Sequence, residues 1–445
     1  MSLVEETNQK KWRAVISFLA LDAAQILLVS ILTINENEPQ MIGFDLSLHD
    51  PVVSIVLFIG IAALQLVLVY YMVTGMLRGE SMHELLPKYD SSIHLASKYS
   101  RDQLVQWTTE IAKKSQVTID RIYLMVSPLP NAFTFHLPFI GSVLVIQSNL
   151  LDLLKPGEVQ SILAHEIGHI KNRDSLVSIF TRMPAFFVDA IYLYFYVRLA
   201  LGIATALLVY VDPITAGIRL IVLLAFLGLS RLMTSFTQLL IQDASRKAEL
   251  LSDYNAAVTM GTEYTMNALI RLGQRIEAVT MLVGEIRWLE SLNPERSGPI
   301  NQAELTRMIS EYPLDNIDEE NAKTMAPWVF LFTKLKHLRD VYGVALDDKE
   351  IVTAIEPAAS SLLEKRGADE RKTSKKEIPS VIDWRQADLN GDRRLSQDEI
   401  VQLVDLLRKN PKKLMFDSEV GKNLLMLDHP DFRSRILFIA DNCKL

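Results

Sequence analysis

Residues 161–174 read SILAHEIGHIKNRD, and within them His165, Glu166 and His169 form the pattern HExxH. Residues four apart lie on the same face of a helix, so both imidazoles can reach one metal ion. Glu166 lies about 100° further round the helix axis and can sit beside the metal without binding it. Two histidines and an adjacent carboxylate suit zinc-dependent hydrolysis, in which the carboxylate takes a proton from the attacking water. The pattern is short, so a chance match is the alternative.

The composition narrows the class of protein. The chain has 445 residues, of which 49% are hydrophobic, with a mean hydropathy of +0.17 and a formal net charge of −7. This charge gives no basis for nucleic-acid binding. The single cysteine, Cys443, can form neither an internal disulfide nor a cysteine-based zinc site, which is in keeping with a reducing compartment.

Apolar runs divide the chain at residues 14–34, 52–76, 184–211 and 218–241. Each run is long enough to cross a bilayer, which needs about 20 residues. A signal peptide is the alternative for the first run, and helices packed on a soluble domain are the alternative for the last two. The runs predict a protein with four transmembrane helices and the lipid bilayer as a partner.

Basic residues predict how these helices are oriented. Three of them lie between positions 10 and 13, before the first run, while Arg78 and Lys88 follow the second run. The connecting segment, residues 35–50, holds acidic residues but no lysine or arginine. Because positive flanks tend to stay inside, we expect the N-terminus and the segment after Arg78 to be cytoplasmic, in a multi-pass protein of the cell membrane.

The segment after residue 98 is expected to combine a helix with short strands. Residues 100–116 suit a helix with Ser100 as its cap, and strand-like runs follow at 122–126, 132–135 and 142–146. Pro156 suits the first position of the helix that carries HExxH. An edge strand before that helix can hold an extended substrate by β-addition.

A catalytic zinc site normally needs a third protein ligand. Glu249 and Asp253 lie four apart in SRKAELLSDYNAA, residues 245–257, and therefore share a helical face. Glu249 can complete a His₂Glu set, and Asp253 can accept the outer N–H of a ligand histidine. An ordinary solvated helix face is the alternative. The two predicted crossings between His169 and Glu249 return both residues to the same side of the membrane.

In this combination the motifs resemble those of the integral-membrane zinc metallopeptidases that include the heat-shock protease HtpX and the CAAX prenyl protease. The matching elements are HEIGHIKNRD at 165–174, NAF at 131–133, SRxxExxxD at 245–253 and HPDFRSRI at 429–436. The resemblance implies a mainly α membrane protein with an α+β zincin-type protease domain. The resemblance also implies roles for single residues. His165, His169 and Glu249 are expected to bind zinc, and Glu166 is expected to be the general base. Asp253 and Arg435 are expected to support the site, and His429 to stabilise the oxyanion.

The function that this resemblance implies is a zinc-dependent endopeptidase with protein or peptide substrates. It would cut membrane or misfolded proteins on the cytoplasmic side, in quality control. A dedicated processing protease of the CAAX type is the alternative within the enzyme class. A helix-start turn is the alternative for His429, since proline follows it.

Residues 388–399, DLNGDRRLSQDE, have the ligand spacing of an EF-hand loop and predict Ca²⁺ as a second metal. The candidate ligands are Asp388, Asn390, Asp392, Arg394, Ser396 and Glu399. Arg393 stands where the sharp turn favours glycine, so a calcium-free EF-hand fold is the alternative. Residues 293–304 form a weaker candidate for a partner loop. A membrane-anchored calcium-responsive protein with an inactive protease domain is therefore a further functional alternative.

These patterns divide the chain into four expected parts. Residues 1–80 form a two-span anchor, and residues 81–260 form the protease domain with its two membrane helices. Residues 261–420 form a helical insertion with EF-hand-like loops. Residues 421–445 return to the protease site.

Overall fold

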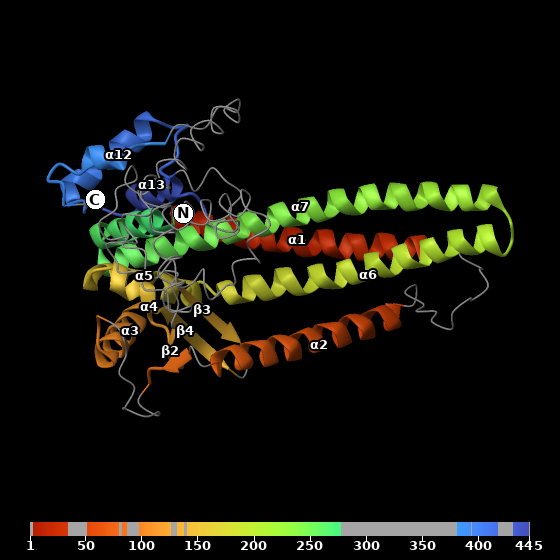
Figure 1. Ribbon diagram of the computed structural model, residues 1–445, viewed down its shortest axis with the longest axis horizontal. Coiled ribbons are helices and arrows are strands. Elements are labelled where there is room, and N and C mark those ends of the chain that lie inside the picture. Colours follow the sequence, from red (N-terminus) through yellow and green to blue (C-terminus); the bar gives the residue numbers. More distant parts are fainter. Residues whose placement is uncertain are drawn as a thin grey trace, which may run out of the picture. The chain divides into compact units, whose positions relative to one another are not determined.

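The structure is a computed structural model, and it describes residues 3–33, 51–79, 82–86, 98–125, 131–137, 140–276, 381–392, 394–416 and 430–444. These residues are mostly helical and include one four-stranded sheet (Figure 1). The chain divides into two compact units. The first comprises Met1–Glu80 and Asn172–Leu251, and the second comprises Ser81–Lys171 and Ser252–Leu445. The expected division into four parts stays a prediction.

Long helices make up the first unit. The predicted apolar runs lie in α1 (Leu3–Thr33), α2 (Pro51–Leu77), α6 (Asp174–Leu208) and α7 (Pro213–Met260). α7 continues without a break through residues 245–257, so the fourth run and the SRxxExxxD block share one helix. Within the described residues, only α7 is both long and apolar enough to cross a membrane. Four transmembrane helices therefore stay a prediction.

A buried lysine joins α1 to the start of α6. Lys11 is fully buried, and its Nζ donates to the main-chain oxygen of Asn172 at 2.9 Å and pairs with Asp174 Oδ1 at 2.8 Å. A cation is stable away from water only when it is paired in this way. Next to it lies a small apolar core of Ala14, Val15 and Ala244.

The second unit is built around the sheet. Its strands are β1 (Met82–Glu84), β2 (Arg121–Met125), β3 (Ala132–Leu137) and β4 (Gly141–Gln147), in the order β1-β2-β4-β3. β2 and β4 are parallel, and the other pairs are antiparallel. The three predicted strands are confirmed within two residues at each end. β1 was missed because three residues carry almost no alternation. β3 is an edge strand of the described sheet.

The second unit has three helices near the sheet in sequence, and two of them begin at predicted start signals. α3 (Arg101–Ser115) begins after Ser100, whose side chain forms a capping box with Gln103. α4 (Ser148–Leu153) continues directly from β4, and α5 (Pro156–Lys171) begins at Pro156. The predicted cap at Ser100 and the predicted helix start at Pro156 are therefore confirmed.

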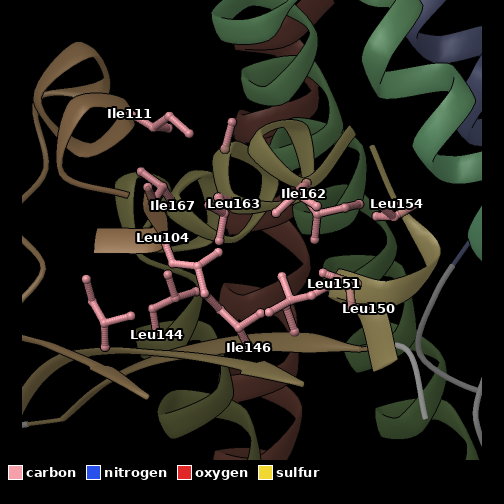
Figure 2. Packing of buried hydrophobic residues seen from close by; sticks show 14 of the residues in the cluster. Leu104, Ile111, Leu144, Ile146, Leu150, Leu151, Leu154, Ile162, Leu163 and Ile167 are labelled. Atoms are coloured by element: carbon pink, nitrogen blue, oxygen red, sulfur yellow. The ribbon is translucent and has the colours of Figure 1, made fainter. Parts of the chain in front are cut away.

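The main apolar core of the second unit lies between the sheet and the helices that cover it (Figure 2). The labelled side chains come from α3, β4, α4, α5 and the α4–α5 connection, and are Leu104, Ile111, Leu144, Ile146, Leu150, Leu151, Leu154, Ile162, Leu163 and Ile167. The buried apolar residues of α5 thus lie before and between its two histidines. Burial on this scale holds the helix rigidly against the sheet.

Gly168 lets α5 approach the last turns of α7 closely. A Cβ at Gly168 would lie 3.0 Å from Ser252 Cα and 3.2 Å from Asn255 Cβ. Asn255 Nδ2 donates to the main-chain oxygen of Ala164 at 2.8 Å in the same crossing. This close crossing sets the distance between the HExxH residues and residues 252–255 of α7.

A second apolar core holds the C-terminal elements of this unit. It joins a helix over residues 262–276 to η2 (Trp384–Ala387), α12 (Gln397–Lys409) and α13 (Phe432–Asn442). The segment that leads into the 388–399 loop forms the 3₁₀ turn η2, and Val381 before it bridges to Leu414. The candidate partner loop at 293–304 lies outside the described residues.

Candidate metal centre

His165, Glu166 and His169 meet on one side of α5. Their ligand atoms lie within 4.8 Å of one another, with His165 and Glu166 buried and His169 partly exposed. The two Nε2 atoms are 3.1 Å apart. Two nitrogens bound tetrahedrally to zinc at about 2.05 Å would be about 3.3 Å apart. The separation of the two Nε2 atoms is therefore close to that of two zinc ligands.

The carboxylate of Asp253, on α7, contacts the Nδ1 side of the His165 ring. Its Oδ1 lies 2.8 Å from His165 Nδ1, and its side chain is almost completely buried. An ionised carboxylate at this position keeps the proton of His165 on Nδ1. The lone pair of Nε2 is then available on the side where His169 lies, as a metal ligand requires.

Arg435 of α13 keeps Asp253 ionised. Its Nε donates to Oδ2 and its Nη2 to Oδ1, both at 2.7 Å. Burial by itself raises the pKa of Asp253. The charge and hydrogen bonds of Arg435, followed by the hydrogen bond from His165, outweigh burial and bring the pKa below its ordinary value. The C-terminal helix therefore reaches the metal centre through this carboxylate.

Thr134 of β3 contacts Glu166. The Thr134 hydroxyl lies 3.0 Å from the main-chain oxygen of Glu166 and 3.2 Å from its Oε2. Sequence reasoning identified this strand as a substrate edge but did not identify Thr134. Thr134 and Glu166 are 32 residues apart, so their contact has no local sequence signal.

The predicted roles of Glu249 and His429, like those of the residues above, stay predictions. Glu249 is buried on α7, but it belongs to the first compact unit, whereas His165 and His169 belong to the second. His429 lies outside the described residues. Of the HPDFRSRI element, the described part ends in α13, which supplies Arg435.

The acidic loop 388–399 directs its oxygens at its own backbone. Asp388 Oδ1 accepts from the main-chain N–H of Gly391 at 2.9 Å, and Asn390 Oδ1 accepts from that of Asp392 at 2.8 Å. Asp392 Oδ1 accepts from the main-chain N–H of Arg394, also at 2.8 Å. These three oxygens are at positions 1, 3 and 5 of the predicted calcium loop.

Glu399, at position 12, is engaged most heavily. Oε2 accepts from the main-chain N–H and the hydroxyl of Ser396, both at 2.8 Å. Oε1 accepts from the main-chain N–H of Leu389 at 2.8 Å and of Asn390 at 3.4 Å. These bonds, led by the Ser396 N–H, lower the pKa of Glu399. A calcium ion would have to displace them, which favours the calcium-free alternative.

The loop is attached to two helices of the second unit, the helix over residues 262–276 and α5. Asn267 accepts from the main-chain N–H of Leu395 at 2.8 Å and donates to its carbonyl oxygen at 2.7 Å. Arg394 Nε donates to Glu158 Oε1 at 2.8 Å, and Glu158 is only 2% exposed. Because Glu158 lies in the first turn of α5, the loop holds the helix that carries the histidines.

Among the described residues, HExxH is the only group of histidine, cysteine and acidic side chains that converges to metal-binding distance. The loop residues Asp388, Asp392 and Glu399 do not form such a group. The Ca²⁺ prediction thus gains no support from this geometry, whereas the Zn²⁺ prediction does.

Comparisons with known proteins match this chain to a family of peptidases. Residues 99–330, which are 232 of the 445, match Peptidase family M48. The Protease HtpX homolog of Methylacidiphilum infernorum is 23% identical over 227 residues, which cover 48% of this chain and 70% of that protein. The homolog of Thermoplasma volcanium is 28% identical over 166 residues, which cover 37% and 48%.

The Protease HtpX homolog of Persephonella marina is 42% identical over 69 residues, which cover 16% of this chain and 24% of that protein. The chain thus spans about a quarter of the length of this relative, 24%. No solved structure matches the chain. Because the family match covers more than half of the residues, the chain belongs to Peptidase family M48.

Proposed function

We propose that this protein is a zinc-dependent endopeptidase of the membrane that hydrolyses membrane or misfolded proteins on the cytoplasmic side. The observation that carries the proposal is the convergence of His165, Glu166 and His169, with Asp253 fixing His165 from behind. Family membership and the names of the relatives support a metalloprotease.

The residues of the chain divide the chemistry between them. A zinc ion held there would polarise the substrate carbonyl and lower the pKa of its bound water to about 7. Glu166 accepts the proton of the attacking water and returns it to the leaving amine, so the carboxylate is regenerated. His165 and His169 hold the ion through Nε2. Glu249 is the proposed third ligand, because it precedes Asp253 by one turn of the uninterrupted helix α7.

The substrate is proposed to bind as an added strand on β3. This strand pairs with β4 on one side and lies at the edge of the described sheet. Main-chain hydrogen bonds to such an edge hold many different sequences in an extended form. His429 is proposed to stabilise the oxyanion, on the family resemblance of the HPDFRSRI element alone.

Exposed apolar surface supports the membrane location. Large apolar side chains are exposed on α2, α6 and α7, including Val56, Ile59, Leu64, Leu193, Leu201, Ile221, Leu232 and Phe236. A bilayer is the medium that would cover such surfaces. Lys11 of α1 contacts Asn172, three residues after His169, which is consistent with a cytoplasmic N-terminus on the same side as the site.

The variant Glu166→Gln tests the function. We expect the full chain in detergent to contain about one zinc ion per chain and to cleave casein. Glu166→Gln should keep the zinc and lose activity by at least about 10²-fold, because the ligands remain while the base is lost. Equal cleavage by the variant and the wild type would overturn the mechanism.

A reporter fused after Glu80 tests the orientation. The proposed topology places this point in the cytoplasm, because it follows the second predicted span and precedes the protease domain. A reporter that is active only outside the cytoplasm should stay silent there. The matched control is the same reporter within residues 35–50, where the proposal expects the opposite signal.

A further inference from the structure

Thr134 links the edge strand to the helix that carries the metal-binding residues. Its hydroxyl lies 3.0 Å from the main-chain oxygen of Glu166 and 3.2 Å from Oε2 of the same residue. It therefore contacts the side chain that the proposed function uses as the base. The residues assigned from the family motifs do not include it.

Strand geometry explains why Thr134 points at α5. Side chains alternate between the two faces of a strand, so Phe133 and Phe135 lie together on the opposite face. Their rings stack with centroids 6.5 Å apart and planes 21° apart. Thr134 itself is opposite Leu144 in the register with β4. Since β4 is buried in the core, the position of the Thr134 hydroxyl is set by the sheet.

The hydroxyl can restrain the Glu166 carboxylate. It has one proton, which it can donate to Oε2 or to the main-chain oxygen, and both acceptors belong to the same residue. A donor on Oε2 limits rotation of the carboxylate and distinguishes its two oxygens. Hydrogen bonds to an ionised acceptor are stronger than those between neutral groups.

We propose that Thr134 is a positioning residue for Glu166 in the hydrolysis proposed above. It orients the carboxylate toward the attacking water while β3 holds the substrate. One strand thereby sets both the path of the peptide and the direction of the base. This inference rests on the proposed function, and it concerns the rate of the chemical step and not the binding of zinc or substrate.

The test compares Thr134→Val with the wild type in the full, zinc-loaded chain. Valine keeps the shape of threonine and removes the hydroxyl. We expect kcat for casein-derived peptides to fall by about 10-fold, with KM and zinc content unchanged, because an interaction that orients the base acts on the chemical step. Thr134→Ser should keep most of the wild-type kcat.

Thr109→Val is the matched control. Thr109 lies on α3, and its hydroxyl donates to the main-chain oxygen of Val105 at 2.8 Å, remote from Glu166 in the chain. This variant should retain the wild-type kcat. If Thr134→Val fails to fold, Thr134→Ser and Thr134→Ala replace it, because both lack the methyl group and only serine keeps the hydroxyl.

The outcomes separate this inference from the function on which it rests. A wild-type chain that binds no zinc, or that is no more active than Glu166→Gln, overturns the proposed function. If the wild type is active and Glu166→Gln is not, an unchanged kcat in Thr134→Val overturns the role of Thr134 alone. A rise in KM without a change in kcat, or equal kcat losses in the serine and alanine variants, also overturns it.

Discussion

Two stretches of this chain have metal-ligand spacing, and they differ in which parts of the chain contact their side chains. At residues 165–169, the side chains are held by other elements, since Asp253 of α7 fixes His165 and Thr134 of β3 contacts Glu166. At residues 388–399, the oxygens accept hydrogen bonds from N–H groups of the same loop. Ligands supported from outside can direct their lone pairs at an ion, whereas oxygens that already accept N–H groups have fewer lone pairs left for one.

The variant that should have the largest effect removes Arg435, the partner of the Asp253 carboxylate that contacts His165. Arg435→Met leaves the Asp253 carboxylate buried without its cation, which should destabilise the fold by about 3–5 kcal/mol. Zinc affinity should also fall by about 10–100-fold, because the partner of a ligand histidine is disturbed. Thermal unfolding in detergent and zinc titration measure the two effects.

Arg408→Met is the control for that experiment. Arg408 Nη2 and Asp441 Oδ1 are also 2.7 Å apart, but their side chains are 52% and 51% exposed. Exposed pairs contribute at most about 1 kcal/mol, so this variant should melt close to the wild type. Equal losses in both variants would show that burial around Asp253 has no special effect.

The attachment of the acidic loop to α5 should have the next largest effect. Arg394→Met leaves Glu158 buried with only its remaining hydrogen bonds, including that from the main-chain N–H of Lys155. We expect a loss of about 2–3 kcal/mol, because hydrogen bonds between charged groups are removed from a buried site. Arg385→Met is the control, since its pair with Asp383 is partly exposed. A calcium-dependent loss would contradict a purely structural contact.

Acid should weaken the loop through Glu399. Its pKa in the folded protein is below the ordinary value, so the unfolded chain takes up the proton first as the pH falls. The stabilisation is therefore complete above the ordinary pKa of about 4.3 and is lost as the pH falls toward the folded pKa. In thermal unfolding at pH 7, the free energy of unfolding of Glu399→Gln should be lower than that of the wild type by about 1 kcal/mol. The difference should shrink in acid. A difference that grows in acid would contradict this sign.

Calcium should have the smallest effect. A loop whose oxygens already accept main-chain hydrogen bonds gains little from the ion, so calcium at about 1 mM should move the melting temperature by less than about 1 °C. Differential scanning fluorimetry with calcium, with magnesium as the control ion, measures this. A saturable rise that disappears in Glu399→Gln would restore the calcium-binding interpretation.

Local patterns predicted the secondary structure of the site well. Ser100 caps α3, Pro156 begins α5, and the HExxH spacing puts both histidines on one face. These features depend on neighbours within one or two helical turns, which a sequence displays directly. Before the acidic loop, residues 384–387 form one 3₁₀ turn, and Val381 bridges to Leu414.

The sequence by itself determined the HExxH helix and the short strands before it. It indicated Asp253 through its spacing from Glu249, and Arg435 through a family resemblance. Only the tertiary structure showed that Thr134 contacts Glu166 and that Arg394 pairs with Glu158. The physical reason is that ligand spacing is a local property of the backbone. The contacts of Thr134 and Arg394 depend instead on packing between segments 32 and 236 residues apart, which no local spacing displays.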